Sequence, residues 1–414
     1  MVFTGLAPIE EVETQMTIET STTFEEIAAR EDEFQLATYK KMRLAAERGR
    51  GAWIETVEGE KYLDLYGGHA VAATGHCHPH VVAALKEQAD KLLFYSNLVY
   101  SDARAHAAQK LVACAPAPMA KVFFCNSGTE ANENAMRMAR IRTRRERIIT
   151  FSGSFHGRTA DAISATALGK YRELGRPNVP GHLFAEFGSI ESVESLADES
   201  VAAVMLEPIQ SMAGVRMAEP EFYRRLRRLC DERGILLIYD EVQTGVGRTG
   251  DWFFAGSESG GEVMPDIITL AKALGSGVPV GACLTSAAVA SHIKENDLGT
   301  TFGGGMLAMA AVRATLEAIE QDRMLENVRT VEKYLRESLS GVTQVARLRG
   351  RGLLLGLEFT SEIAASVNKA LLQRRIITGT SSDPRVLRLL PPLCLKREEI
   401  DLLVEALKHT VVQR

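Results

Sequence analysis

The sequence predicts an α/β protein, with a large domain built on a mostly parallel sheet and a second, smaller α+β domain. Between residues 121 and 281, short continuous apolar runs alternate with helical segments, a pattern typical of strands covered on both faces. A polar or charged cluster follows each run directly, at the strand edge where open α/β sheets bind ligands. The length of 414 residues also exceeds that of one ordinary core.

The large sheet is expected from five apolar runs, each ending at a glycine-marked turn or a helix. The runs are short and nearly free of polar residues, so they are read as buried strands. In order, the runs are 121–125, 147–151, 201–208, 235–240 and 265–272. The first is followed by a helix over 126–143, the second by the turn 152–159, and the third by a loop and a helix over 220–234. The last two are followed by the segments 241–250 and 273–281.

The alternation of apolar runs and helical segments ends at about residue 311, and the smaller domain is expected from there. A long helix over 308–339 leads to the apolar segment 347–359, a further helix, and the segment 386–411. The N-terminal segment 51–68 is expected to join this domain. The predicted divisions are an N-terminal extension over 1–33, a first part of the small domain over 34–75, the large domain over 76–310 and the rest of the small domain over 311–414.

The composition predicts a soluble, cytoplasmic protein without nucleic-acid or membrane partners. Hydrophobic residues make up 46% and charged residues 24%, and a net charge of -5 gives no sign of nucleic-acid binding. The six cysteines are scattered singly, mostly in apolar runs, as buried reduced thiols are. No apolar run reaches the length of a membrane helix, and the N-terminus lacks the basic start of a secretion signal.

The first candidate site is the segment "NSGTEANENA", which places Ser127, Gly128 and Thr129 at the start of a helix that follows a strand. Free backbone N–H groups and the positive end of the helix dipole favour a phosphate there. The same residues also fit an ordinary N-terminal cap, with Thr and Glu in a capping arrangement. Taken alone, the segment is equally consistent with both interpretations.

Two further strand ends carry charged residues in apolar surroundings. Asp240 ends the run "ILLIYD", where an acid is costly unless it has a partner, although it could also cap the next turn. Lys272 ends the run "PDIITLAK". Burial opposes the charge of its ammonium group, and the lowered pKa suits a lysine that forms a Schiff base. The alternative, a surface lysine with its apolar stem buried, is weakened by the flanking apolar and glycine residues.

Together the three sites predict pyridoxal phosphate, because this cofactor needs a phosphate cradle, an acid for its ring nitrogen and an imine-forming lysine. The segment "SFHGRT" adds Phe155 as a candidate for stacking on the ring and Arg158 as a candidate for binding a carboxylate. The combination is far more specific than any of its parts.

The chain resembles the class III (ω-type) pyridoxal-phosphate aminotransferases from about residue 36 to its end, most closely the acetylornithine and succinylornithine branch. The motifs that carry the resemblance are "YLDLYGGHAVAATGHCHP", "VFFCNSGTEANENAMRMAR", "FHGRT", "EPIQ", "CDERGILLIYDEVQTGVGRTG", "LAKALGSGVPVGA", "TTFGGG" and "VLRLLPPL". The resemblance implies the fold type I of pyridoxal-phosphate-dependent transferases, in which aspartate aminotransferase is the reference.

The resemblance also assigns roles by position. For the cofactor, it implies the Schiff base at Lys272, the ring-nitrogen partner Asp240, the phenolic-oxygen partner Gln243, the ring contacts Val242 and Phe155, the nearby acid Glu207, and phosphate contacts from Ser127, Gly128, Thr129 and the partner subunit's Thr301. For the substrates, it implies Arg158 for the donor's α-carboxylate with Thr300 and Tyr39 nearby, and Arg388 for the α-carboxylate of the keto acid. A homodimer with shared active sites follows from the position of Thr301.

The implied reaction transfers a terminal amine from an N-acylated ornithine to 2-oxoglutarate, giving a semialdehyde and glutamate by ping-pong kinetics. Alternative donors are ornithine, 4-aminobutyrate, diamines and lysine-pathway acyl amines. An aminomutase of the glutamate-semialdehyde type is a rival, but it would not need Arg388 for a second carboxylate. A catalytically inactive binding protein is disfavoured by the presence of Lys272 and Asp240.

Two motifs are interpreted as structural. "GHCHPH" at 75–80 invites a zinc interpretation, but its spacing is wrong for a tetrahedral site and no metal is expected. "GVGRTG" at 245–250 lacks the Lys-Ser/Thr ending of a nucleotide-binding loop.

The chain departs from the family pattern at Met212, where "EPIQSMAG" has methionine in place of a second glutamate, and at Gly305-Met306, where relatives usually have Asn-Pro. In many relatives that glutamate pairs with the equivalent of Arg388 while the donor binds. Methionine cannot do so, and we expect Arg388 either to stay available to anions or to find another counter-ion. Donors with an additional carboxylate or a polar acyl group, such as succinylornithine, should then be favoured.

Overall fold

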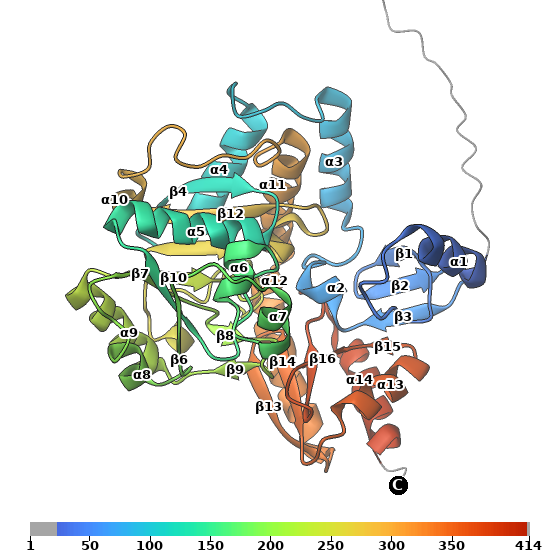
Figure 1. Ribbon diagram of the computed structural model, residues 1–414. Helices are drawn as coiled ribbons and strands as arrows, with labels where there is room; N and C mark the ends of the chain where they lie inside the picture. The colour runs from blue at the N-terminus through green and yellow to red at the C-terminus, as the bar shows by residue number, and fades with distance from the viewer. Residues whose placement is uncertain (1–22, 412–414) are drawn as a thin grey trace, which may run out of the picture. The chain divides into compact units, whose positions relative to one another are not determined.

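The chain folds into two units in this computed structural model, which describes residues 23–411 (Figure 1). Within the described range, the first unit comprises residues 23–48 and 55–60, and the second comprises 49–54 and 61–411. Residues 1–22 of the predicted N-terminal extension lie outside the described residues. The predicted boundaries at 34, 76 and 311 stay predictions.

The first unit contains one helix, α1 (Phe24–Phe34), among its described residues. The Thr23 side chain caps this helix by accepting a hydrogen bond from the backbone N–H of Glu26. The Phe24 N–H donates to the Glu58 carboxylate at 2.8 Å, so the second segment of the unit holds the start of the helix. Strands β1 (Ala46–Arg50) and β2 (Trp53–Thr56) run across the division between the units.

A seven-stranded sheet forms the centre of the second unit, in the order β4-β12-β11-β10-β7-β5-β6. Strand β12 is antiparallel to both of its neighbours, and the other strands run in one direction. The strands are β4 (Met119–Cys125), β5 (Arg147–Phe151), β6 (His182–Ala185), β7 (Val201–Leu206), β10 (Leu236–Asp240), β11 (Ile267–Leu270) and β12 (Gly281–Ser286). The predicted mostly parallel sheet is therefore present, and the carboxyl ends of β4, β5, β7, β10 and β11 lie at one edge.

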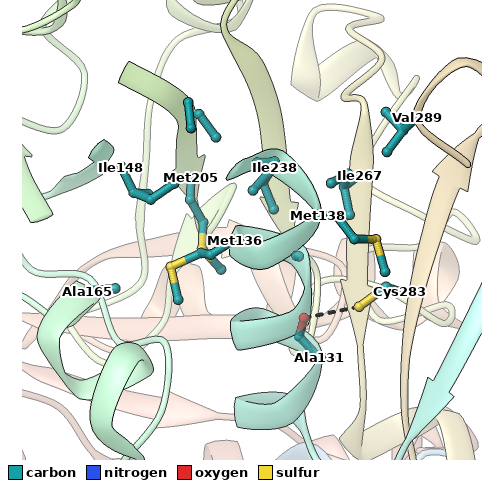
Figure 2. Close-up of a cluster of buried hydrophobic side chains, with 14 of the residues drawn as sticks. Ala131, Met136, Met138, Ile148, Ala165, Met205, Ile238, Ile267, Cys283 and Val289 are labelled. Atoms are coloured by element: carbon teal, nitrogen blue, oxygen red, sulfur yellow. Dashed lines mark hydrogen bonds between the residues drawn. The ribbon is translucent and has the colours of Figure 1, made fainter. Parts of the chain in front are cut away.

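Helix α5 (Gly128–Thr143) packs across one face of this sheet, against β7, β10, β11 and β12 (Figure 1). Its apolar side, which includes Met136 and Met138, meets the strand residues Ile148, Met205, Ile238 and Ile267 in a fully buried cluster (Figure 2). The dashed line in Figure 2 marks the Cys283 thiol donating to the backbone carbonyl of Ala131 at 3.0 Å. This packing fixes the start of α5 at the carboxyl edge of the sheet.

Other helices surround the sheet and complete the second unit's core. Helix α9 packs against β10, α4 packs against β4, and α11 packs against α3 and α4. The helices in this part are α2 (Gly67–Ala70), α3 (Pro79–Lys91), α4 (Asp102–Cys114), α6 (Ala160–Ala165), α7 (Gly169–Leu174), α8 (Ile190–Glu194), α9 (Pro220–Arg233) and α10 (Ala287–Ala290), with the 3-10 turns η1 (Glu258–Gly260) and η2 (Lys272–Gly275). The short strands β8 (Ile209–Gln210) and β9 (Arg216–Met217) pair with each other.

A second sheet lies in the C-terminal part, in the order β13-β14-β17-β16. Glu358 of β14 accepts hydrogen bonds from Arg347 and Arg349 of β13, which ties the two strands together. The elements here are β13 (Val345–Arg351), β14 (Leu354–Phe359), β16 (Gly379–Thr380) and β17 (Val386–Leu389), with α11 (Met306–Gln321), α12 (Met324–Ser338), η3 (Leu339–Gly341), α13 (Ala364–Gln373) and α14 (Arg397–Val411). Strand β15 (Ile376–Ile377) pairs instead with β3 (Lys61–Asp64), in parallel.

The single helix expected over 308–339 is wrong, because the structure has two helices, α11 and α12, that meet at Asp322 and Arg323. Arg323 adopts a φ of 52°, in the left-handed region, and this ends the run of helical hydrogen bonds. The methionine and leucine stripe is core, as predicted: Met306, Met309 and Leu316 are buried.

Burial of the cysteines is only partly as expected. Cys125, Cys230 and Cys283 are buried, and burial raises the pKa of Cys125 and of Cys230 to about 12. Cys77, however, is exposed, because it lies in the turn before α3 rather than in an apolar run. No helix within residues 23–411 is long and apolar enough to cross a membrane.

Candidate active site

A cavity of about 440 Å³ opens at the carboxyl edge of the seven-stranded sheet. Ten of the fourteen sequence-predicted site residues line it: Ser127, Gly128, Thr129, Phe155, Arg158, Glu207, Asp240, Val242, Gln243 and Lys272. They come from the ends of β4, β5, β7, β10 and β11 and from the start of α5, so the sheet topology brings them together. Tyr39, Thr300, Thr301 and Arg388 are not part of this lining.

Asp240 ends β10 and is buried, with its carboxylate held from three directions. Oδ2 accepts hydrogen bonds from His156 Nδ1 and Asn132 Nδ2, each at 2.8 Å, and Oδ1 accepts one from the Val242 N–H at 3.1 Å. Thr269 in turn donates to Asn132 Oδ1 at 2.6 Å, which fixes the orientation of the amide. The carboxylate therefore has one orientation in the wall of the cavity.

Asn132 and His156 are site residues that the sequence predictions missed. Asn132 lies in the middle of α5, where a polar residue usually faces solvent, but it is buried against the sheet. His156 belongs to the motif "SFHGRT", and that motif was the only signal for it. Its Nε2 is buried without a hydrogen-bond partner among the described residues.

Lys272 lies two residues after the end of β11 and is half-buried, with a backbone φ of 42°. Its amine forms no hydrogen bond with any residue in the range 23–411. Burial lowers the pKa of Lys272, while the nearby carboxylates of Asp240 and Glu207 act in the opposite direction. The result is an amine that loses its proton more readily than an exposed lysine does and faces the cavity.

Glu207 follows β7 and is buried, and its carboxylate accepts a hydrogen bond from the Phe155 N–H at 2.8 Å. Burial raises the pKa of Glu207, and the negative charge of Asp240 adds to the rise. The contact places Phe155 at the cavity wall, where its ring meets the edge of the Tyr171 ring at 5.4 Å. The guanidinium carbon of Arg158 lies over the same tyrosine ring, 4.4 Å from its centroid, and Arg158 is exposed.

The first turn of α5 forms one end of the cavity. Ser127 caps the helix by accepting from the Glu130 N–H, and the Glu130 carboxylate accepts from the Asn126 N–H at 2.7 Å. The predicted capping by Thr and Glu is only partly correct, because Ser127 rather than Thr129 caps the helix and Glu130 reaches Asn126. The N–H groups of Gly128 and Thr129 have no acceptor within a helix at this position, so the turn keeps free donors for an anion.

Arg388 lies on β17 beside the cavity, close enough for its charge to act on Lys272. It is buried, and its Nε, Nη1 and Nη2 donate to the Thr380 carbonyl at 2.7 Å, the Ser211 hydroxyl at 3.1 Å and the Tyr66 hydroxyl at 2.5 Å. No carboxylate of the described residues forms an ion pair with it. The three contacts are all with neutral groups, so they supply no acidic counter-ion, and the availability of Arg388 to anions stays a prediction.

Three predicted residues lie elsewhere. Thr300 accepts a hydrogen bond from Asn126 at 3.2 Å, one residue away from the cavity lining. Thr301 is exposed, and its predicted contribution to a neighbouring subunit stays a prediction. Tyr39 belongs to the first unit, where its side chain is exposed, and its place beside the substrate likewise stays a prediction.

The histidines of "GHCHPH" point to three separate carboxylates. His76 contacts Asp64 at 2.8 Å, His78 contacts Asp322 at 3.0 Å, and His80 contacts Glu317 at 2.8 Å. Each histidine thus has a structural partner of its own.

The cavity combines groups that could hold a phosphorylated, cationic aromatic ring. Free N–H groups at the start of α5 suit the phosphate, the fixed carboxylate of Asp240 suits a protonated ring nitrogen, and the amine of Lys272 suits covalent attachment to a carbonyl carbon. The buried Oε1 of Gln243 has no partner among residues 23–411, and Gly277 leaves open space in the lining, where an added Cβ would meet no atom within 4 Å.

The sequence profile described as aminotransferase class-III matches residues 35–411. The chain is 43% identical over 371 residues to the acetylornithine aminotransferase of Methanopyrus kandleri, which covers 89% of this chain and 95% of that protein. It is also 43% identical over 380 residues to the acetylornithine aminotransferase of Archaeoglobus fulgidus, covering 91% of this chain and 98% of the other.

Solved structures with the same fold include an ornithine aminotransferase from Toxoplasma gondii, with a TM-score of 0.88 at 28% identity over 95% of this chain and 96% of that one. The acetylornithine aminotransferase of Elizabethkingia anophelis gives a TM-score of 0.82 at 27% identity over 95% of this chain and 100% of that one.

Proposed function

Because the chain belongs to the class-III aminotransferases, which depend on pyridoxal phosphate, we propose that it transfers the terminal amine of N-acetylornithine to 2-oxoglutarate. The products are the acylated semialdehyde and glutamate. The donor rests on relatives that carry this name at 43% identity over about nine-tenths of the chain. The observation that carries the chemistry is that the amine of Lys272 and the oriented carboxylate of Asp240 share one cavity.

The residues of the cavity fit pyridoxal phosphate. Gln243 Oε1 is buried and needs a donor, which the phenolic oxygen of the cofactor supplies when it carries a proton. A Cβ at Gly128 would lie 3.0 Å from both methyl groups of Val242, so the glycine lets the helix start lie close against the residue predicted to contact the ring. When bound, the cofactor provides an electron-accepting ring for the carbon that loses a proton.

Residues from several elements would hold the cofactor. We assign the phosphate to the start of α5, at Ser127, Gly128 and Thr129, and the ring nitrogen to Asp240. Val242 and Phe155, which line the same cavity, would contact the ring. His156 and Asn132 keep Asp240 oriented, since both donate to the oxygen that they share.

Lys272 carries out the proton transfers of the reaction. Its amine, once released from covalent attachment, removes a proton from the donor carbon that bears the amine and returns it in the next step. The lowered pKa suits this task because it increases the share of the neutral amine, which is the form that accepts a proton. Phe155 and Val242 give the cavity apolar lining.

Two guanidinium groups bind the carboxylates in this proposal. The exposed Arg158 binds the α-carboxylate at the far end of the donor, with Thr300 and Tyr39 nearby. Arg388, beside Lys272, binds the α-carboxylate of 2-oxoglutarate, which is attached to the carbon that accepts the amine. Two carboxylate sites support a two-substrate transfer over an internal amine shift.

The decisive experiment is an amino-donor panel assayed with 2-oxoglutarate. It includes acetylornithine, succinylornithine, ornithine, 4-aminobutyrate and acylated diamino acids, and it measures glutamate formation. We expect the acylated ornithines to rank first, and to give no product without a keto acid. Turnover of glutamate semialdehyde without a keto acid would support an aminomutase instead. Borohydride treatment that fixes the cofactor on Lys272 and abolishes activity would identify the reactive lysine.

Succinylornithine is a second candidate donor, favoured by the environment of Arg388. This guanidinium contacts only neutral groups, and Met212, next to its partner Ser211, supplies no acid. The variant Met212→Glu would add a negative charge at the residue next to Ser211, whose hydroxyl contacts Arg388. We expect it to lower kcat/KM for succinylornithine relative to acetylornithine by about 10-fold, since a charge pair at partly buried distance is worth roughly 1–2 kcal/mol. An unchanged donor ranking would eliminate this explanation of specificity.

We also infer that the enzyme is a homodimer with active sites shared between subunits. Its support is an apolar surface formed by residues 92–100 and Phe302. Phe302 follows Thr301 in the sequence, and its ring centroid lies 5.1 Å from that of Phe94. Leu98 is 90% exposed and Phe302 is 65% exposed. Exposed apolar surface of this kind is typical of a subunit interface. This arrangement would bring Thr301 to the phosphate of the partner's cofactor.

We propose a cytoplasmic location on the evidence of the thiols. All six cysteines are free, and the three that are buried have no partner for a disulfide. Free thiols in this number fit a reducing compartment. Measurement of cofactor-dependent activity in fractionated cells would test this assignment.

A further inference from the structure

The guanidinium of Arg388 is held by neutral groups alone. Thr380, Ser211 and Tyr66 each accept one N–H, and the group is 3% exposed. Burial lowers the pKa of Arg388, which shows how strongly its surroundings oppose the charge. A buried cation without an acidic partner is costly, so the arrangement favours a negatively charged ligand.

The two hydroxyl groups have donor capacity that the protein does not use. In both contacts the hydroxyl oxygen accepts from Arg388, so the hydroxyl proton is directed elsewhere. Neither proton has an acceptor among the residues that the structure describes. Arginine has five N–H donors, and three of the five are used here, so two remain. The unused groups are therefore all donors, as a carboxylate requires.

Tyr66 is held firmly in this position. Asp64 Oδ1 accepts from the N–H groups of Tyr66 and Gly67 at 2.9 and 2.8 Å, and His76 contacts its other oxygen at 2.8 Å. The tyrosine ring lies against Gly379, where a Cβ would collide with it. The Tyr66 ring centroid is 5.3 Å from the Arg388 guanidinium carbon, so the ring face also contacts the cation.

Ser211 is fixed from a different direction, in the loop after β8. Its backbone carbonyl accepts from the N–H groups of Gly214 and Val215, at 3.3 and 3.2 Å, and the residue is fully buried. The hydroxyl groups of Tyr66 and Ser211 are thus attached to separate loops and meet at one guanidinium. An arrangement preformed in this way needs little reorganisation when an anion binds.

We propose that Tyr66 and Ser211 complete, with Arg388, a carboxylate-binding subsite in which both hydroxyls donate to the substrate's carboxylate oxygens. This inference rests on the proposed function, since it concerns the carboxylate next to the carbon that accepts the amine. Tyr66 is then a specificity-determining residue: it selects keto acids over aldehydes and ketones that lack a carboxylate at this carbon. It acts in the keto-acid half of the reaction and not in the donor half, where the reacting carbon bears no carboxylate.

The test compares Tyr66→Phe and Ser211→Ala with the matched control Tyr334→Phe in the cofactor-loaded enzyme. Tyr334 is a hydrogen-bonded tyrosine on α12, and its hydroxyl donates to Asp401 at 2.6 Å. The two half-reactions are followed separately by the absorbance of the cofactor, first with the acylated donor and then with 2-oxoglutarate. Binding of glutarate, which has no keto group, is measured by calorimetry as a readout that needs no turnover.

For Tyr66→Phe we expect the KM for 2-oxoglutarate and the Kd for glutarate to rise about 10-fold or more, as the loss of a hydrogen bond to a charged group implies. The rate of the donor half-reaction should stay within about 2-fold of the parent. Ser211→Ala should shift the same two constants in the same direction, and Tyr334→Phe should shift neither.

Equal losses in both half-reactions, or an unchanged Kd for glutarate in both site variants, would overturn the subsite. These outcomes differ from a failure of the proposed function. If no acylated ornithine reacts but glutarate binding still depends on Tyr66, the subsite is supported and the assigned donor is wrong. If acylated ornithine reacts and the KM for 2-oxoglutarate and the Kd for glutarate are unchanged in the variants, the assigned donor is supported and the subsite is wrong.

Discussion

Lys272 shows how a single residue combines strain with reactivity. Its φ of 42° lies in the left-handed region, which costs a non-glycine residue about 1–2 kcal/mol. The backbone that follows is the 3-10 turn η2, which places the side chain at the cavity rather than along the strand. Strain of this kind persists only where the surrounding structure imposes it, and the buried strand β11 does so here.

The pH dependence of cofactor uptake follows from the lowered pKa of Lys272. In enzyme freed of cofactor, attachment needs the neutral amine, so the rate of uptake rises with pH and levels off above the pKa of Lys272. Because burial lowers this pKa, we expect the plateau to begin below the value of about 10.4 at which an exposed lysine titrates. Stopped-flow absorbance between pH 6 and pH 10 would measure the profile.

Asp240→Asn provides the matched comparison. The Asp240 carboxylate raises the pKa of Lys272, so removing its charge should move the plateau to a still lower pH. A plateau that begins at the pH of an ordinary lysine, in the parent enzyme, would contradict the role of burial.

The sequence identified those site residues that stand out in their own strand. Asp240 and Lys272 are charged residues at the ends of apolar runs, so their unusual position is visible without a structure. Asn132 and Tyr66 are different. Asn132 reads as an ordinary helix residue, and Tyr66 meets Arg388 across a separation of 322 positions. Such contacts depend on tertiary packing, which local pattern does not contain.

At the scale of elements, the hairpin of β13 and β14 is held by one carboxylate. Glu358 contacts Arg349 through both oxygens, at 2.6 and 2.7 Å, and also contacts Arg347. Arg349 extends the network to Asp383 and to the carbonyl of Gly214, each at 3.1 Å. The loop that contains Met212 and Ser211 is thereby connected to the C-terminal sheet.

Glu358→Gln should destabilise the protein in a manner that depends on pH. Hydrogen bonds from Arg349 hold the pKa of Glu358 at about 2, below its ordinary value of 4.5. A carboxyl group with a lowered pKa contributes stability that is complete above the unfolded-state pKa and is lost as pH falls towards 2. We expect a loss of about 1–3 kcal/mol at pH 7 and a smaller loss at pH 3.5, by urea unfolding.

Glu337→Gln serves as the control for this measurement. Glu337 lies 4.0 Å from Lys333 on an exposed face of α12, where an ion pair contributes little. Its replacement should change the free energy of unfolding by less than about 0.5 kcal/mol. Equal effects of the two variants, or a Glu358→Gln effect that does not vary with pH, would contradict the assigned network.

The elements of the sheet were predictable because each apolar run is bounded by glycine or polar residues. Strand β5 has the predicted bounds, and helix α5 begins two residues after the predicted start. The division between α11 and α12 was not predictable. Neither Asp322 nor Arg323 is a helix-breaking residue, and the left-handed φ of Arg323 has no signal in the local sequence.

At the scale of the whole molecule, the apolar surface of residues 92–100 and Phe302 governs the proposed assembly. Leu98→Glu should give a monomer, because a charged group at a buried apolar contact opposes association. Thr301 is proposed to contact the phosphate in the partner's site, so the loss of the dimer should also lower the affinity for the cofactor. Sedimentation and equilibrium dialysis of the cofactor measure the two effects.

Leu402→Glu is the corresponding control. Leu402 is also an exposed apolar residue, 48% accessible on α14, but it lies outside the apolar surface defined above. Its variant should keep the parent's oligomeric state and affinity. A monomeric Leu98→Glu that binds cofactor as tightly as the parent would show that the active sites are not shared.

The rate at which the buried thiols are alkylated reports how often the large sheet opens. Cys283 lies on β12 and Cys125 at the end of β4, and burial holds the pKa of both above the ordinary range. The thiolate is the form that alkylating reagents attack, so these two positions react only while the strands are separated. Cys77 is exposed, so its alkylation needs no opening of the sheet and serves as the reference for the reaction. Mass spectrometry of timed alkylation would therefore report how often this edge of the sheet opens, with and without cofactor.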